Sequence, residues 1–364
     1  MRLLYQHVLK PLLFRLDPEW VHDVFVNLGE ILGRHVLTRR LVSLAYDYHG
    51  PDASVTVDGI RYRTPVVLAA GFDYNGRLVR ILKGMGFGGV EVGSVTARPT
   101  EGNPPPRLTR LVRSQSLLVN KGLRNDGVDC IAQRLRDIPR EPDFTVGVSI
   151  ARTNDAEAAT VAGGVADYCT SLRRLVAADV GDFYTINISC PNVHGGESFA
   201  EPALLRRLLE SLCTVEHSRP MYAKMPIDVS DEDFDALLAI IAAFGLRGVV
   251  IGNLNKDYET LEFREEAPAT YRGGLSGRPC FESSNRLIRR AREKYGDRLT
   301  VIGCGGILSP SDALEKFRGG ADLVQLITGM IFEGPHLMKG IAYAYARERN
   351  SPGLAARSVS VEDH

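Results

Sequence analysis

The segment Thr185-Ile-Asn-Ile-Ser-Cys-Pro-Asn192 holds the residues best suited to chemistry. An apolar run ends there in two asparagines, a cysteine and a proline. Amide side chains at a strand end can pair with the donors and acceptors of a flat heterocycle, and a deprotonated thiol can accept a proton. A strand that simply ends in a turn, with Cys190 buried and inert, fits the same segment. Both interpretations stay open on this segment alone.

A lysine and several runs of small residues indicate a bound cofactor. Lys224 stands inside an apolar run, where its ammonium would stabilise negative charge on a reduced cofactor, although a strand-end lysine that reaches solvent fits the same pattern. The small residues Ala69-Ala-Gly71 would let a flat cofactor approach the backbone. Glycine-rich turns follow at 273–277, 303–306 and 328–329. These turns predict a cradle of backbone N–H groups for a phosphorylated cofactor.

A regular alternation of strands and helices must position these residues. Apolar segments predict strands at 66–70, 89–95, 145–150, 184–188, 221–225, 248–252, 300–303 and 323–327. Helical patterns lie at 78–85, 165–178, 204–215, 234–244, 284–295 and 311–318. Eight near-continuous apolar strands interspersed with helices predict a (β/α)8 TIM barrel, with a doubly wound open sheet as the alternative. In a barrel the chemistry lies at the carboxyl ends of the strands.

The first 45 residues differ from the rest. Leucines and valines between residues 3 and 13 form one helical stripe, and Asp17-Pro18 is typical of an N-cap before a second helix that runs to Gly33. These two amphipathic helices either pack on the main domain or lie on a bilayer surface. A short β-hairpin is expected at 55–62. We therefore expect an N-terminal extension at 1–45, a barrel at 46–348 and a flexible polar tail at 349–364.

The composition excludes several classes of function. Lys plus Arg and Asp plus Glu each number 44, so the net charge gives no reason to expect a nucleic-acid partner. The 6 cysteines are scattered without metal-ligand spacing, which predicts no metal site and no disulfide framework. No apolar run approaches the ~18 residues of a membrane span, and the N-terminus does not have the pattern of a signal peptide.

The motifs together resemble the dihydroorotate dehydrogenases, specifically the class 2, membrane-associated, quinone-reducing branch. The resemblance runs from about residue 3 to 345. It is carried by Leu16-Asp-Pro-Glu, Ala69-Ala-Gly-Phe-Asp, Gly93-Ser-Val-Thr-Ala-Arg-Pro, Asn187-Ile-Ser-Cys-Pro-Asn192, Gly273-Gly-Leu-Ser-Gly-Arg-Pro and Gly303-Cys-Gly-Gly. It implies a (β/α)8 barrel that binds FMN and oxidises dihydroorotate to orotate in pyrimidine biosynthesis. It also implies a quinone acceptor that enters between the N-terminal helices, and peripheral attachment to the cytoplasmic side of the cell membrane.

The resemblance also implies roles for individual positions. Cys190 would remove the ring proton of the substrate, and Lys224 would stabilise the reduced flavin. The expected cofactor contacts are Ala70, Gly71, Ser94, Ser149, Asn187, Lys224, Gly252, Gly277, Gly305, Gly306, Thr328 and Gly329. The expected substrate contacts are Tyr74, Asn120, Lys121, Gly122, Leu123, Arg124, Asn187, Asn192, Asn253 and Leu254.

Several of these residues depart from the family pattern. Cys190 is the base of class 1, whereas class 2 uses serine. Tyr74 replaces a lysine that contacts the substrate carboxylate and the flavin. The loop that begins at Asn120 is one residue shorter than in the family and has gained Lys121 and Arg124. Two further positions near the cofactor and substrate also differ, because Ser149 replaces an asparagine and Leu254 a threonine.

These departures leave three hypotheses. In the first, Lys121 or Arg124 replaces the missing cation and dihydroorotate remains the substrate. In the second, the protein is a paralogue that keeps FMN but acts on another small cyclic molecule. The third is a non-catalytic flavin-binding protein, against which the retained thiol argues.

Overall fold

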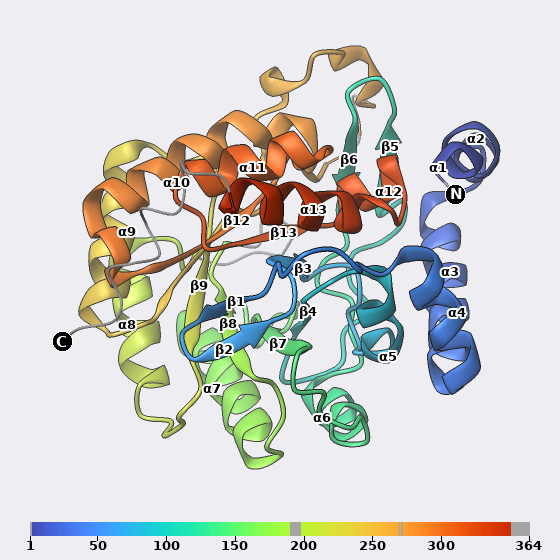
Figure 1. The fold of residues 1–364 in the computed structure, drawn as a ribbon. Helices are drawn as coiled ribbons and strands as arrows, with labels where there is room; N and C mark the ends of the chain where they lie inside the picture. Colours follow the sequence, from blue (N-terminus) through green and yellow to red (C-terminus); the bar gives the residue numbers. More distant parts are fainter. Residues whose placement is uncertain (1, 190–197, 269, 271, 351–364) are drawn as a thin grey trace.

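Eight parallel strands form a closed barrel in the computed structural model, which describes residues 2–189, 198–268, 270 and 272–350 (Figure 1). The strands follow one another around the barrel in chain order. They are β3 (Val66–Leu68), β4 (Gly89–Val95), β7 (Thr145–Ile150), β8 (Phe183–Asn187), β9 (Met221–Met225), β10 (Gly248–Ile251), β12 (Thr300–Cys304) and β13 (Leu323–Leu326). The predicted TIM barrel is confirmed, and each of its strands lies where the apolar run predicts it.

Helices cover the outside of the barrel (Figure 1). They are α5 (Val79–Leu82) with the 3-10 turn η2 (Lys83–Met85), α6 (Val128–Arg136), α7 (Val161–Ala177), α8 (Pro202–Leu212), α9 (Asp231–Ala243), α10 (Phe281–Tyr295), α11 (Pro310–Arg318), the short α12 (Thr328–Glu333) and α13 (Leu337–Arg349). Hydroxyl side chains cap several of them; Ser230, for example, accepts a hydrogen bond from the backbone N–H of Asp233. The sequence patterns did not predict α6 and α13, whose apolar residues are interrupted by charged ones.

A hairpin closes the amino-terminal end of the barrel. Strands β1 (Val55–Val57) and β2 (Ile60–Tyr62) pair as predicted, and Val57 and Tyr62 pack against side chains from inside the barrel. The Asp58 carboxylate in the turn accepts hydrogen bonds of 2.7 Å from Tyr222 and from Thr300, which begins β12. The opposite, carboxyl-terminal end is therefore left for a functional site.

Three short strands form a separate antiparallel sheet over that carboxyl-terminal end. Strand β6 (Ser116–Val119) pairs with β5 (Leu108–Leu111) on one side and with β11 (Gly274–Leu275) on the other. The sequence did not predict this sheet. Its third strand comes from the glycine-rich turn at 273–277, so the sheet holds that turn over the barrel.

The N-terminal extension packs beside the barrel, next to α5 and α12 (Figure 1). It starts with α1 (Arg2–Leu4), a π-helical turn η1 (Tyr5–Leu9) and α2 (Lys10–Leu13), and continues with α3 (Pro18–Arg34) and α4 (Val36–Tyr46). The Asp17 side chain accepts a 2.8 Å hydrogen bond from Trp20 N, as expected of an N-cap. Tyr5 donates to the carbonyl of Ile331 at the far end of the chain. The two predicted helices are present, and α4 adds a third.

Candidate active site

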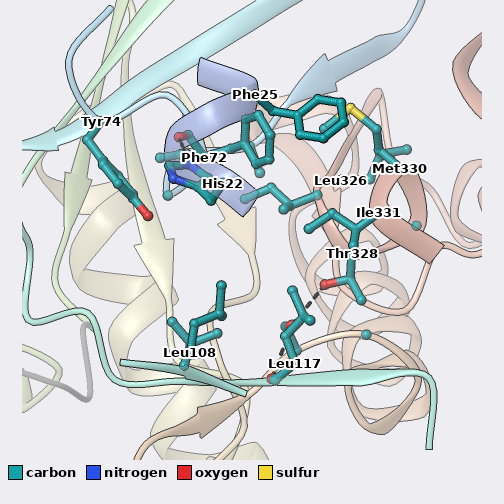
Figure 2. A pocket seen from close by; sticks show the side chains of 18 of the residues that line it. His22, Phe25, Phe72, Tyr74, Leu108, Leu117, Leu326, Thr328, Met330 and Ile331 are labelled. Atoms are coloured by element: carbon teal, nitrogen blue, oxygen red, sulfur yellow. Dashed lines mark hydrogen bonds between the residues drawn. The ribbon is translucent and has the colours of Figure 1, made fainter. Parts of the chain in front are cut away.

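One cavity joins the carboxyl end of the barrel to the N-terminal helices. Its volume is about 460 Å³. The inner part is lined by strand ends and the loops that follow them, and the outer part by apolar side chains of the extension. Figure 2 shows His22 and Phe25 of α3 facing the cavity, with Leu326 and Met330 of the barrel close by. The cavity can therefore hold a group in the barrel and a second, apolar group between the helices.

Glycines shape the inner wall at the ends of β12 and β13. Gly305 and Gly306 have φ angles of +110° and +77°, which side chains rarely adopt. A Cβ atom on Gly306 would lie 2.5 Å from the Cβ of Phe281. Beside this loop the hydroxyls of Ser276 and Thr328 share a 2.8 Å hydrogen bond, and Thr328 begins α12 (Figure 2). Backbone N–H groups and hydroxyls at such a loop suit a phosphate.

Lys224 supplies a positive charge to the inner cavity. The residue is only 5% exposed, and its ammonium forms no hydrogen bond or ion pair with any residue in the described part of the chain. The buried Glu91 carboxyl accepts a hydrogen bond from Gln325. Burial raises the pKa of Glu91, and the charge of Lys224 partly opposes that shift. The Lys224 ammonium is thus available to an anionic group in the cavity.

A row of amide and hydroxyl groups crosses the cavity floor. Asn187 donates to Ser94 Oγ at 2.9 Å, and the hydroxyls of Ser94 and Ser149 share a 2.8 Å hydrogen bond. Asn253 donates to Asn187 Oδ1 at 3.1 Å and to Ser189 Oγ at 2.9 Å. These hydrogen bonds hold neighbouring groups in place, so the row can recognise the polar edges of a flat ring.

A cluster of charges lies at the wall around Tyr74. The Lys121 ammonium lies 5.4 Å from the centre of the Tyr74 ring and donates to Glu19 Oε1 at 3.2 Å. Arg124 Nη1 lies 3.4 Å from the same oxygen. Burial raises the pKa of the Tyr74 hydroxyl, and Lys121 partly lowers it, so Tyr74 is a neutral phenol near pH 7. Its hydroxyl points toward the cavity (Figure 2).

The sequence analysis did not identify two residues of α3 that belong to this site. Glu19 pairs with Lys121, and His22 lies with its ring centre 5.1 Å from that of Tyr74. His22 Nε2 is also 2.8 Å from the carbonyl oxygen of Phe72. Helical spacing offered a signal, because His22 shares one face of α3 with Phe25, which also lines the cavity.

Most of the predicted site residues line this one cavity. Those predicted to bind the cofactor are Ala70, Gly71, Ser94, Asn187, Lys224, Gly252, Gly277, Gly305, Gly306, Thr328 and Gly329. Those predicted to bind the substrate are Tyr74, Lys121, Gly122, Leu123, Arg124, Asn187, Asn253 and Leu254. The roles of these residues stay predictions.

The remaining four predicted residues fall into two groups. Ser149 does not line the cavity, because its hydroxyl lies behind that of Ser94. Asn120 does not line it either, and its Oδ1 accepts a 2.8 Å hydrogen bond from Asn103. Cys190 and Asn192 lie outside the described residues.

The surface of the extension is unusually apolar. Nearly all exposed large hydrophobic residues of the described chain fall between residues 3 and 44, with Val112 and Tyr343 as the others. Leu37 and Leu44 of α4 are 69% and 74% exposed. Large exposed apolar patches are typical of interaction surfaces. In the part of the chain that the structure describes, no helix is long and apolar enough to cross a bilayer. Within the same residues, no group of three or more His, Cys, Asp or Glu side chains could hold a metal ion.

Comparisons with known proteins agree with this geometry. The dihydroorotate dehydrogenase family model matches residues 52–346. The "Dihydroorotate dehydrogenase (quinone)" of Thermobifida fusca (strain YX) is 37% identical, over 99% of this chain and 97% of that protein. Its namesake in Thermosynechococcus vestitus is 35% identical, over 92% and 94%. The crystal structure of DHODH from Eimeria tenella in complex with ferulenol has a TM-score of 0.80 at 26% identity and covers 93% of each chain. The chain therefore belongs to the dihydroorotate dehydrogenase family of flavin-dependent oxidoreductases.

Proposed function

We propose that this protein oxidises dihydroorotate to orotate, uses FMN as its flavin and passes the electrons to a quinone. The observation that carries the proposal is the single cavity, which joins a glycine-rich cradle and Lys224 to an apolar passage between the N-terminal helices. Both relatives named above are quinone-dependent dihydroorotate dehydrogenases, and this chain matches each of them over nearly its whole length. This similarity supports the same activity here.

The inner cavity fits FMN. Gly305, Gly306 and Thr328 would hold the phosphate, and Ala70 and Gly71 leave room for the flat ring system. When bound, FMN supplies the redox chemistry, because it accepts two electrons as a hydride and returns them to a quinone. Lys224 would stabilise the negative charge that reduction places on the ring system.

The substrate would be held by amides and deprotonated by a thiol. Asn187 and Asn253 are fixed by hydrogen bonds and present their remaining polar atoms to the cavity. Cys190 would accept the ring proton, because a thiol needs only a modest shift from its ordinary pKa of ~8.5 to act near neutral pH. Ser189, its neighbour and the last described residue before it, donates a 2.8 Å hydrogen bond to the carbonyl of Lys224.

The quinone would occupy the outer cavity. Phe25, Leu28 and Met330 give this part an apolar lining, and Arg110 provides a cation at its rim, 4.9 Å from the Phe14 ring centre. The exposed apolar surface of the extension would bind the cytoplasmic face of the cell membrane peripherally, so that a quinone dissolved in the bilayer could enter directly.

Tyr74 supports a second candidate function. A neutral phenol cannot neutralise a carboxylate, so a paralogue of the family that acts on an uncharged cyclic molecule would also fit this wall of the cavity. The two candidates differ in the charge of the substrate.

Anaerobic reduction distinguishes the two candidates. Purified FMN-loaded protein is mixed with dihydroorotate, and the oxidised flavin absorbance is followed. We expect bleaching, and recovery of the absorbance when a soluble quinone is added. Dihydrouracil, which lacks the carboxylate, serves as the matched control and should bleach the flavin far more slowly. Bleaching by dihydrouracil but not by dihydroorotate would replace the first candidate by the paralogue.

A further inference from the structure

A carboxylate substrate needs a cation in this cavity. An anion enclosed in a low-dielectric site without a partner is costly. Four lysine and arginine side chains from the described residues line the cavity: Arg110, Lys121, Arg124 and Lys224. Tyr74 is neutral near pH 7, so these four side chains are the lysine and arginine candidates for that cation.

The positions of these four side chains show which of them is best placed to bind a substrate carboxylate. Lys224 lies in strand β9 of the barrel wall near Glu91 and is suited to the flavin. Arg110 lies against Phe14 of the extension and donates to the carbonyl of Leu16 at 2.7 Å, away from the amide row. The Arg124 side chain is 35% exposed, which gives water access to its charge, whereas that of Lys121 is 10% exposed.

Glu19 forms an ion pair with Lys121 and also contacts two arginines. The Glu19 carboxylate lies 3.0 Å from Arg107 Nε, 3.2 Å from Lys121 Nζ and 3.4 Å from Arg124 Nη1. If Lys121 turned toward a ligand, Glu19 would keep two guanidinium partners. Arg124 Nη1 also lies 3.6 Å from Asp23 Oδ2, so three cations face two carboxylates here and one positive charge is left for an anion.

The backbone of Lys121 is held by hydrogen bonds, and its side chain lines the cavity. The Lys121 carbonyl accepts a 3.2 Å hydrogen bond from Asn103 N, and Asn154 donates to the carbonyl of Gly122 at 3.1 Å. The aromatic face of Tyr74 lies beside the ammonium and attracts it by a cation–π interaction. Tyr74 thus guides the lysine that stands in for the missing family cation.

We propose that Lys121 binds the carboxylate of the substrate, exchanging Glu19 for it, and that Glu19 is the internal competitor for this ammonium. The inference rests on the proposed function, because it requires a carboxylate substrate. Lys121, and not Arg124, then binds the carboxylate. Through Glu19, the N-terminal extension takes part in substrate binding as well as in quinone access.

Two variants of one ion pair test this inference. Lys121→Met should raise the dihydroorotate KM by about 10- to 100-fold, the loss expected for one charge-assisted hydrogen bond to a buried anion. Glu19→Gln should leave the KM unchanged or lower it, since a competitor is removed. Lys121→Arg should restore most of the affinity. The readout is the rate of flavin reduction as a function of dihydroorotate concentration, with FMN content checked for each variant.

The two variants should affect the dihydroorotate KM differently. This difference distinguishes a role of Lys121 in substrate binding from a purely structural role. If Lys121 only anchors the extension through Glu19, both variants break the same pair and should impair the protein alike, which would overturn the proposal. An unchanged KM in Lys121→Met together with a raised KM in Arg124→Met would assign the role to Arg124 instead. A wild-type protein that dihydroorotate does not reduce would contradict the proposed function itself, and the role of Lys121 would fall with it.

Discussion

Lys224 and Glu91 lie near each other inside the barrel, yet only one of them faces the cavity. Lys224 lines it, whereas Glu91 is fully buried and held by Gln325. One carboxyl oxygen of Glu91 and the amide oxygen of Gln325 have no hydrogen-bond partner among the described residues. A proton on Glu91 would turn one of these two acceptors into a donor. Burial raises the pKa of Glu91 and so favours the protonated form of this carboxyl.

The raised pKa of Glu91 makes stability depend on pH. Because the pKa of Glu91 is higher in the folded than in the unfolded protein, its contribution is complete below the ordinary value of 4.5 and is lost as the pH rises through the raised value. Glu91→Gln should therefore flatten the fall of Tm with rising pH in FMN-loaded protein, because glutamine has no proton to lose. Parallel Tm curves for the two proteins would show that Glu91 does not take up a proton on folding.

The predicted base gives a second test at the residue scale. Cys190→Ala should abolish flavin reduction by dihydroorotate while FMN stays bound, because alanine has no group that can accept the ring proton. Cys190→Ser should retain activity only at higher pH, since an alcohol ionises far less readily than a thiol. Stopped-flow reduction across pH measures both. Full activity of the alanine variant would make Cys190 a structural residue.

Among the elements, the N-terminal helices contribute both to the cavity and to the exposed apolar surface. The inner face of α3 contributes Glu19, His22 and Phe25 to the cavity and its wall, whereas the outer faces of α3 and α4 expose leucines and aromatic residues. Deleting residues 1–40, which should reduce quinone turnover and liposome binding, would also remove Glu19. Substitutions on the outer face separate the two roles more cleanly.

The double variant Leu37→Glu/Leu44→Glu should weaken membrane binding without affecting the cavity. Each exposed leucine would contribute ~1.5–3 kcal/mol on burial in lipid, so liposome partitioning should fall at least about tenfold. Flavin reduction by dihydroorotate should not change. Ala239→Glu is the matched control, because it adds a charge to the exposed face of α9, across the barrel from α5 and the extension. Equal liposome binding by both variants would place the membrane contact elsewhere.

At the scale of the whole molecule, the proposed FMN site gathers residues from most strands of the barrel. One FMN per chain should therefore stabilise the complete fold, by about 2.7 kcal/mol when free FMN is 100 times its Kd. Protein that stays colourless after refolding with FMN would contradict the flavin site. Titration of the apoprotein, followed by Tm and flavin fluorescence, measures stoichiometry and affinity.

Two glycine variants sharpen this prediction. Gly306→Ala places a methyl group against Phe281 and should lower FMN affinity together with the stability that FMN provides. Gly245→Ala is the control, because its φ of +72° imposes a similar backbone strain but its Cβ meets no atom within 4 Å. Similar FMN affinity in both variants would show that the cradle does not depend on close packing at Gly306.

The sequence by itself determined the barrel, its hairpin and a set of site residues, most of which line the cavity. Strand periodicity, the Asp17 N-cap and the Asp58-Gly59 turn depend on neighbouring residues, so local patterns reveal them. Once a parallel barrel is inferred, its strand ends must meet at one face. That constraint alone brings Asn187 and Lys224 together.

Only the tertiary structure decided which charged residues meet at the cavity wall around Tyr74. Glu19 and Lys121 are 102 positions apart, and no local pattern shows that α3 turns a carboxylate toward the loop that begins at Asn120. The antiparallel sheet of β5, β6 and β11 was hidden for the same reason, because its two-residue third strand pairs with β6, a segment far away along the chain. Such contacts depend on how the packed barrel places distant segments, and this placement is a property of the whole chain.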